Sequence, residues 1–106
     1  MHWGNEYEHN PTKRQEELAL FLAEHKVDLV IGHHPHVVQP VRLIERKDGG
    51  STLVYFSLGN FISAQKQNYT LLGGMALVRI VKDGEKITLE EAEYRLNRRC
   101  MKADLS

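Results

Sequence analysis

Residues 27–36 read VDLVIGHHPH, and this stretch decides how the rest of the chain is interpreted. Its first half, residues 27–31, is a nearly continuous apolar run rich in branched residues, which predicts a strand buried on both faces in an α/β sheet. Gly32 ends this strand in a turn. Because α/β sheets build their sites at the carboxyl ends of strands, the histidines after Gly32 are candidates for function.

Patterns on either side of this strand predict one helix and two hairpins. Asn10 and Pro11 suit the N-cap and the first position of a helix. Asp48-Gly49 between two β-rich runs is a hairpin signal. The expected elements are a helix over 11–25, strands over 41–46 and 52–57, a loop over 58–73, and strands over 75–81 and 87–89. The residues after 89 are charged and weakly patterned, so no element is expected there.

The composition allows one small soluble domain. The chain has 106 residues, with 14 Lys plus Arg and 14 Asp plus Glu, so its formal net charge is zero and no nucleic-acid partner is expected. Cys100 is the only cysteine, which excludes an internal disulfide. No run approaches the roughly 20 apolar residues of a membrane span, so the chain is expected to be soluble as given. Residues 1–95 are assigned to the domain and residues 96–106 to a tail of unclear structure.

The histidine turn has the composition of a metal site. His33, His34 and His36 occupy three of four consecutive positions. Neutral imidazole is a common ligand for zinc and iron, and two rings at His34 and His36 on an extended loop can be aimed at one metal cluster. Pro35 stiffens the backbone between them, which favours fixed ring positions. The alternative is a surface turn whose histidines only form hydrogen bonds.

Other polar residues remain open to two interpretations. His2 is either disordered near the terminus or a ligand. Glu6 is a solvated charge, a general acid or an acceptor in the shell around a metal. Asn60 lies in residues 57–61, SLGNF, which form either a plain turn, since Gly59 and Asn60 tolerate positive φ, or a polar loop facing the site.

An ordered series of motifs resembles the bacterial capsule synthesis protein family CapA, also called the poly-gamma-glutamate synthesis protein family. The motifs are HWGxEY at 2–7, Gln15 with its helix, VIGHHPHV at 30–37, QP at 39–40 and YFSLGNF at 55–61. The resemblance is strong over about residues 2–65 and continues loosely to about residue 95. The family looks like a branch of the calcineurin-like metallophosphoesterases. This implies that the chain is the carboxy-terminal part of an αββα sandwich with two metals held between loop ends.

The resemblance also implies a set of metal ligands. A lone histidine after a central strand binds metal in such proteins, and His2 fits this role. A later Gly-His-x-His turn binds metal as well, and its spacing is kept here by His34 and His36, with one residue inserted after Gly32. His33 is the alternate ligand. The metals implied are divalent zinc, manganese or iron, and the remaining ligands belong to Gly-Asp and Asn-His motifs that lie upstream in the family.

The function implied is metal-assisted hydrolysis of a phosphoester or polymer bond. His33 is the candidate catalytic residue, which would donate a proton to the leaving oxygen, while Glu6 and Asn60 would bind substrate or support the metal ligands. The implied partners are an anionic polymer or phosphoester and membrane-associated capsule synthesis proteins, with the full-length protein anchored outside the cytoplasmic membrane. The alternative is a non-catalytic subunit that binds, assembles or exports the capsule polymer.

The chain alone is expected to be inactive, because it contains only part of the implied ligand set. It is also expected to self-associate, since a sheet cut from its partner leaves an exposed apolar face or edge strand.

Overall fold

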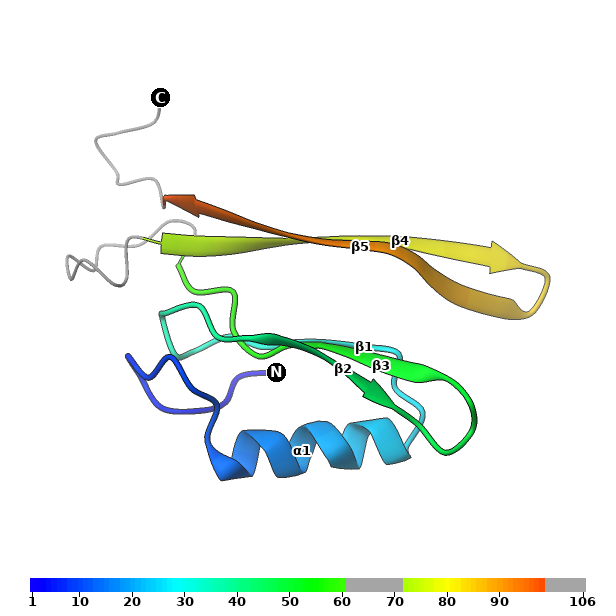
Figure 1. Cartoon of the computed structure of the whole chain (residues 1–106), viewed down its shortest axis with the longest axis horizontal. Coiled ribbons are helices and arrows are strands. Elements are labelled where there is room, and N and C mark those ends of the chain that lie inside the picture. Colours follow the sequence, from blue (N-terminus) through cyan, green and yellow to red (C-terminus); the bar gives the residue numbers. More distant parts are fainter. Residues whose placement is uncertain (61–71, 99–106) are drawn as a thin grey trace.

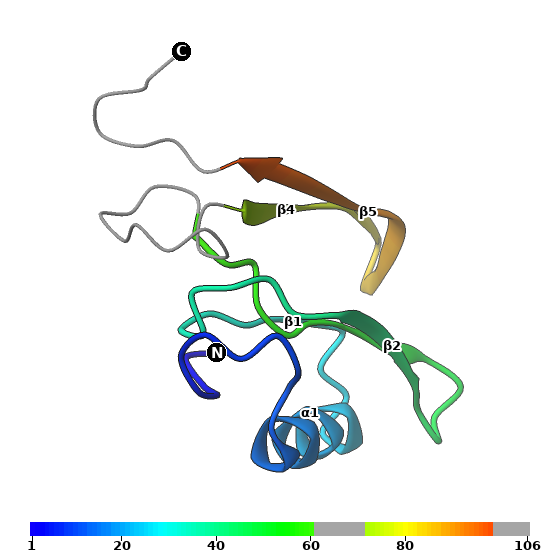
Figure 2. The same ribbon diagram turned by 60° about the vertical axis from the view of Figure 1, so that its left-hand side comes forward.

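One helix and two sheets make up the computed structural model, which describes residues 1–60 and 72–98. The elements are α1 (Lys13–Glu24), β1 (Leu29–Ile31), β2 (Val41–Glu45), β3 (Ser51–Tyr55), β4 (Leu72–Asp83) and β5 (Lys86–Arg98). The first sheet has the strand order β1-β3-β2, and the second consists of β4 and β5. In Figures 1 and 2 the three-stranded sheet lies between α1 and the β4–β5 hairpin. The mixed α/β fold expected from the sequence is confirmed.

The helix α1 begins after Thr12. The Thr12 side chain accepts a hydrogen bond from the backbone N–H of Gln15 at 3.1 Å, and the Gln15 side chain accepts one from the Thr12 N–H at 2.8 Å. This reciprocal capping box satisfies two backbone donors at once. The prediction that Asn10 caps the helix was therefore wrong. Ala19 and Ala23, four residues apart, are buried on the face of α1 that packs on the sheet.

The three-stranded sheet combines a parallel and an antiparallel pair. β1 runs parallel to β3, and β2 runs antiparallel to β3 with Val41 opposite Tyr55. The β2–β3 hairpin predicted from the Asp-Gly turn is confirmed. The prediction of a first strand buried on both faces was wrong, because β1 lies at the edge of the sheet and only Val30 is fully buried. Leu29 and Ile31 point to the opposite face and remain partly exposed.

The core lies between α1 and the three-stranded sheet. Its buried members are Trp3, Ala19, Val30, Val54 and Phe56. The rings of Trp3 and Phe56 stack with their centroids 5.6 Å apart, and the Trp3 indole N–H donates to the Phe56 carbonyl at 2.8 Å. The residues before α1 are therefore part of the core, and this anchors the neighbouring His2.

The β4–β5 hairpin is longer than the sequence predicted. β5 continues to Arg98, through residues that were expected to form a charged tail without an element. Ala92, Tyr94 and Leu96 alternate with charged residues, which is the period of a strand with one apolar face. The cross-strand pairs on this face include Ala76 with Tyr94 and Val78 with Ala92. The central part of the predicted loop, residues 61–71, lies outside the described residues.

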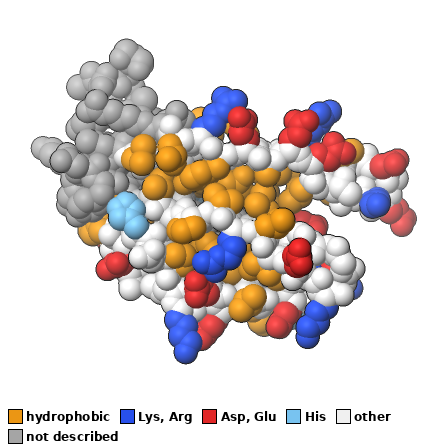
Figure 3. Space-filling view, viewed as in Figure 1, with side chains coloured by type: hydrophobic (Ala, Val, Ile, Leu, Met, Phe, Trp, Pro, Cys, Tyr) orange, Lys and Arg blue, Asp and Glu red, His pale blue; other side chains and the backbone are white. Residues whose placement is uncertain are grey.

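Tyr55 links the two sheets. Its hydroxyl donates to the Glu93 carbonyl at 3.3 Å, and its ring lies 5.6 Å from the ring of Tyr94. Figure 3 shows hydrophobic side chains gathered over both sheets. The large exposed hydrophobic residues of these strands are Leu43, Leu72, Met75, Leu77, Ile80, Ile87 and Leu96. Self-association of the chain remains a prediction, and this exposed surface is its structural basis.

Within the described residues, no helix is both long and apolar enough to cross a membrane.

Candidate metal centre

The histidine turn follows β1 and lies beside the end of β3. Since β1 and β3 are parallel, the residues that follow them meet at one edge of the sheet. The Gly32 N–H donates to the Tyr55 carbonyl at 2.7 Å. A side chain at Gly32 would collide with the Phe56 carbonyl and the Trp3 indole nitrogen, so glycine is required there. This packing sets the histidine turn against residues 57–60.

Residues 1–3 run alongside the start of the turn. The His33 N–H donates to the Met1 carbonyl at 2.7 Å, and the Trp3 N–H donates to the His33 carbonyl at 3.1 Å. These bonds form a parallel bridge between His2 and His33. The structure therefore holds His2 in an ordered segment, and the interpretation of His2 as a disordered terminal residue was wrong.

The rings of the three predicted ligands lie side by side. The ring centroids of His2 and His34 are 4.2 Å apart, and those of His34 and His36 are 5.8 Å apart. The ring centroid of Tyr7 lies 6.3 Å from that of His36. Across residues 1–60 and 72–98, however, no group of three or more His, Cys, Asp or Glu side chains is arranged to hold a metal ion. The described chain thus has adjacent imidazoles from two segments, without a complete ligand shell.

The backbone is strained at two of the candidate ligands and at Tyr7. φ is +106° at His34, +62° at His36 and +66° at Tyr7. Positive φ in residues with side chains costs about 1–3 kcal/mol and persists only where the surroundings enforce it. One such contact is the hydrogen bond from the Tyr7 N–H to the Pro35 carbonyl, at 2.7 Å. Every second residue of the turn is buried, namely Pro35, Val37 and Gln39.

His33 is exposed beside the ring group. Partial burial lowers the pKa of its imidazole, and the positive charges of the Met1 amine and of His2 lower it further. The ring is therefore neutral at pH 7. A neutral ring suits a metal ligand or a proton acceptor, whereas a proton donor must first take up a proton.

Of the two supporting residues predicted for the site, Asn60 contacts a candidate ligand and Glu6 is exposed. Asn60 is buried, with 7% exposed, and its Oδ1 lies 2.9 Å from Nδ1 of His36. Asn60 therefore lies beside one of the candidate ligands, while the positive φ of Gly59, +70°, agrees with a turn at the same place. Glu6 is exposed, and no hydrogen bond or ion pair joins it to another described residue.

Two buried glutamines, to which no sequence pattern assigned a role, join the helix to the turn. Gln15 and Gln39 are 1% and 3% exposed, and the Gln15 side chain donates to Oε1 of Gln39 at 2.7 Å. Nε2 of Gln39 in turn donates to the Glu8 carbonyl at 2.7 Å. The pair thereby fastens the segment between His2 and α1 to the turn. The spacing of Thr12 and Gln15 is a capping-box signature that could have identified half of this arrangement.

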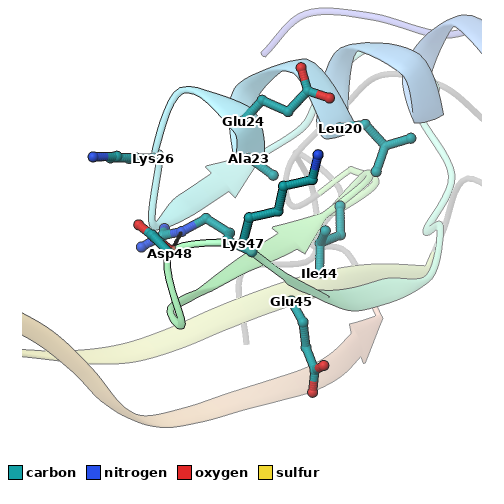
Figure 4. Close-up of a pocket in the computed structure, with 9 residues that line it drawn as sticks. Leu20, Ala23, Glu24, Lys26, Ile44, Glu45, Lys47 and Asp48 are labelled. Carbon is teal, nitrogen blue, oxygen red and sulfur yellow. Dashed lines mark hydrogen bonds and ion pairs between the residues drawn. The ribbon is translucent and has the colours of Figure 1, made fainter.

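Two hollows on the surface lie away from the histidines. Figure 4 shows one between α1 and the β2–β3 turn, with Leu20, Ala23 and Ile44 among its apolar residues and Lys47 reaching across it. Another lies between the β2–β3 hairpin and β5. None of the candidate histidines lines either hollow. The candidate site is therefore separate from both of these hollows.

Comparisons with known proteins agree with the motif series. The model of the family described as "Bacterial capsule synthesis protein PGA_cap" matches residues 1–65. The chain is 40% identical over 78 residues to the capsule biosynthesis protein CapA of Bacillus anthracis. The aligned region covers 74% of this chain and 17% of that protein. It is 34% identical over 83 residues to the PGA biosynthesis protein CapA of Bacillus subtilis (strain 168). This aligned region covers 78% of this chain and 20% of that protein.

No solved structure matches the chain. The chain spans about a fifth of the length of these curated relatives. The family match nevertheless covers the candidate histidines, residues 57–60 and both glutamines. This chain therefore belongs to the bacterial capsule synthesis protein family PGA_cap.

Proposed function

We propose that His2, His34 and His36 contribute to a divalent-metal site that serves hydrolysis of a phosphoester or polymer bond in capsule poly-gamma-glutamate synthesis. The observation that supports this proposal is the convergence of three imidazoles at one sheet edge, with neighbouring ring centroids 4.2 and 5.8 Å apart. Their segments are anchored by Trp3 in the core and by the buried Pro35. The segments that carry the rings are therefore positioned before any ligand binds, although the three rings are not arranged around one point.

The donor set fits zinc or iron, for which neutral imidazole is a typical ligand. Zinc requires about four ligands, so three rings would supply most but not all of one site. Manganese prefers carboxylate oxygens and would depend more on residues outside this chain. The family resemblance assigns the remaining ligands to upstream motifs, and the matched region makes up only 17–20% of the curated relatives.

A bound metal would supply positive charge and lower the pKa of a water molecule at the site. His33 lies next to the ring group and is assigned the proton transfer to the leaving oxygen. Its lowered pKa means that it must first gain a proton, which makes it an acceptor before it is a donor. Glu6 and Asn60 are assigned to substrate binding or to the support of the ligands. Since the chain has no net charge, bound cations would provide the attraction for an anionic polymer.

Metal content of the untagged chain tests the first half of the proposal. We expect stoichiometric zinc, manganese or iron in the wild type and its loss in the double variant His34→Ala/His36→Ala. The matched control is His9→Ala/His25→Ala, which removes two exposed histidines outside the ring group. Metal retained by both double variants, or by neither, would contradict the assignment of His34 and His36.

Hydrolysis is tested in a full-length relative that contains the upstream motifs. We expect metal-dependent cleavage of a phosphodiester or of poly-gamma-glutamate, abolished by the changes equivalent to His34→Ala/His36→Ala. Binding of poly-gamma-glutamate without any cleavage would instead favour the alternative, a subunit for polymer binding, assembly or export. Membrane anchoring of the full-length protein and contact with other capsule synthesis proteins belong to the same proposal.

A further inference from the structure

Asn60 follows two residues that are fixed by contacts with neighbouring segments. It follows Gly59, whose φ is +70° and whose α-carbon faces the Leu72 carbonyl so closely that a side chain would come within 2.9 Å of it. Bridges pair Leu58 with Val38 and Gly59 with Gly73, so the segment before Asn60 is fixed on both sides. The Asn60 side chain therefore meets His36 from a backbone that has little freedom to move.

The contact between these side chains has a chemical consequence. Oδ1 of Asn60 lies 2.9 Å from Nδ1 of His36, and a carbonyl oxygen only accepts hydrogen bonds. Nδ1 must then carry the proton, and in the neutral ring Nε2 keeps its lone pair. An imidazole free in water favours the opposite tautomer, with the proton on Nε2. Asn60 is thus an identifiable cause for a tautomer that would otherwise be the minor one.

Two other rings lie beside the ring of His36. The ring centroid of His36 lies 6.3 Å from that of Tyr7. The rings of His36 and His34 meet in an edge-type contact, with 5.8 Å between their centroids. His36 itself has a φ of +62°, in the left-handed region, and its two neighbours in the chain, Pro35 and Val37, are buried. With Nδ1 engaged by Asn60, Nε2 is the ring nitrogen available for a cation.

We propose that Asn60 is a positioning residue that holds His36 as the Nδ1–H tautomer and so makes Nε2 the metal-donor atom. The tautomer stands on the Asn60 contact alone, whereas the role in metal binding rests on the proposed function. Partners of this type fix the tautomer of ligating histidines, and their loss lowers metal affinity by about 10–100-fold.

NMR of the ring nitrogens in isotope-labelled, metal-free chain tests the tautomer, at about pH 8, above the ordinary histidine pKa. We expect a protonated Nδ1 on His36 in the wild type and in Asn60→Asp, which keeps the acceptor. In Asn60→Leu, which removes the acceptor, the proton should shift to Nε2. Circular dichroism establishes that each variant is folded, and Asn5→Leu makes the same change at an exposed site. A protonated Nε2 in the wild type, or an unchanged Nδ1–H in folded Asn60→Leu, would overturn the proposal.

Zinc affinity, measured by competition with a chelator, tests the metal role separately. Asn60→Leu should bind Zn²⁺ about 10–100-fold more weakly than the wild type, with Asn60→Asp and Asn5→Leu close to the wild type. Equal affinity of the wild type and Asn60→Leu would overturn the positioning role. If the tautomer depends on Asn60 and no variant binds Zn²⁺, the proposed metal site fails while the control of the His36 tautomer by Asn60 is supported.

Discussion

The amide groups of Gln15 and Gln39 meet across 2.7 Å with almost no exposure to water. Each amide is satisfied mainly by the other and by nearby backbone, so removal of one leaves the other buried without its partner. We expect Gln15→Ala and Gln39→Ala each to lower the free energy of unfolding by about 1–3 kcal/mol. The double variant should lose less than the sum of the two losses, with a coupling energy of about 0.5–3 kcal/mol. Urea denaturation measures all three.

Glu17→Ala on the exposed side of α1 is the control and should change the unfolding free energy by about 0.5 kcal/mol or less. Strictly additive losses in the glutamine variants would show that the two side chains act independently.

Trp3 should be the most costly single residue to remove from the segment that carries His2. Trp3→Phe keeps an aromatic ring on Phe56 but leaves the Phe56 carbonyl without its indole donor, which should cost about 1–3 kcal/mol. Trp3→Ala also removes the buried ring and should cost about 3–5 kcal/mol. Thermal and urea unfolding report both changes. Phe21→Leu, at a position that is 53% exposed, should leave stability nearly unchanged.

Glycine at position 32 should be irreplaceable for a steric reason. In Gly32→Ala the new methyl group would overlap the Phe56 carbonyl and the Trp3 indole nitrogen, and the backbone cannot yield without breaking the β1–β3 edge. We expect loss of the folded state or a fall in unfolding free energy beyond about 3 kcal/mol. Gly49→Ala isolates the effect of positive φ, because that glycine has φ +88° in open space, and should cost only about 1 kcal/mol. Similar losses for the two variants would refute the steric explanation.

Stability should fall in alkaline solution because of Tyr94. Burial raises the pKa of its phenol, and the neighbouring Tyr55 raises it further. In the unfolded chain the Tyr94 phenol ionises at about pH 10, whereas in the folded chain its pKa is higher. The free energy of unfolding is therefore unaffected by this group below about pH 10 and declines as the pH rises toward the raised pKa. Tyr94→Phe should make this decline shallower. Urea unfolding at a series of alkaline pH values measures the slope.

At neutral pH the same variant should be at least as stable as the wild type. The Tyr94 hydroxyl is buried and has no hydrogen-bond partner in the described part of the chain, so its removal loses no bond. Tyr55→Phe is the counterpart, since it deletes the hydroxyl that donates to the Glu93 carbonyl and should lower stability. A destabilised Tyr94→Phe would mean that the hydroxyl has a partner after all.

Local signals explain what the sequence could predict of the fold. The β2–β3 hairpin depends on an Asp-Gly turn between β-rich runs, and both features are adjacent in the chain. β5 was missed beyond Leu89 because charged residues on its outer face hid the alternation of Ala92, Tyr94 and Leu96. The N-cap was misassigned because Asn10 has the right side chain, while only Thr12 has a glutamine three residues later to complete the box.

The candidate site likewise has features that local sequence patterns predict and features that depend on contacts between distant segments. His33, His34 and His36 stand out because they are clustered in the chain, and the strand before them predicts their place at a sheet edge. The packing of His2 on His34 depends on the pairing of residues 1–3 with the turn, a contact between distant segments that no local pattern encodes. The contact of Asn60 with His36 likewise depends on the parallel pairing of β1 with β3.

The alternating burial of the histidine turn makes its length as specific as its composition. Pro35, Val37 and Gln39 point inward while the residues between them reach the surface, so deleting one residue would turn a histidine into the core and a core residue out to water. The β2–β3 turn at residues 47–50 is exposed or partly exposed throughout and has no such constraint. Insertions and deletions should therefore be tolerated in the β2–β3 turn and should destabilise the fold in the histidine turn, at the opposite end of the three-stranded sheet.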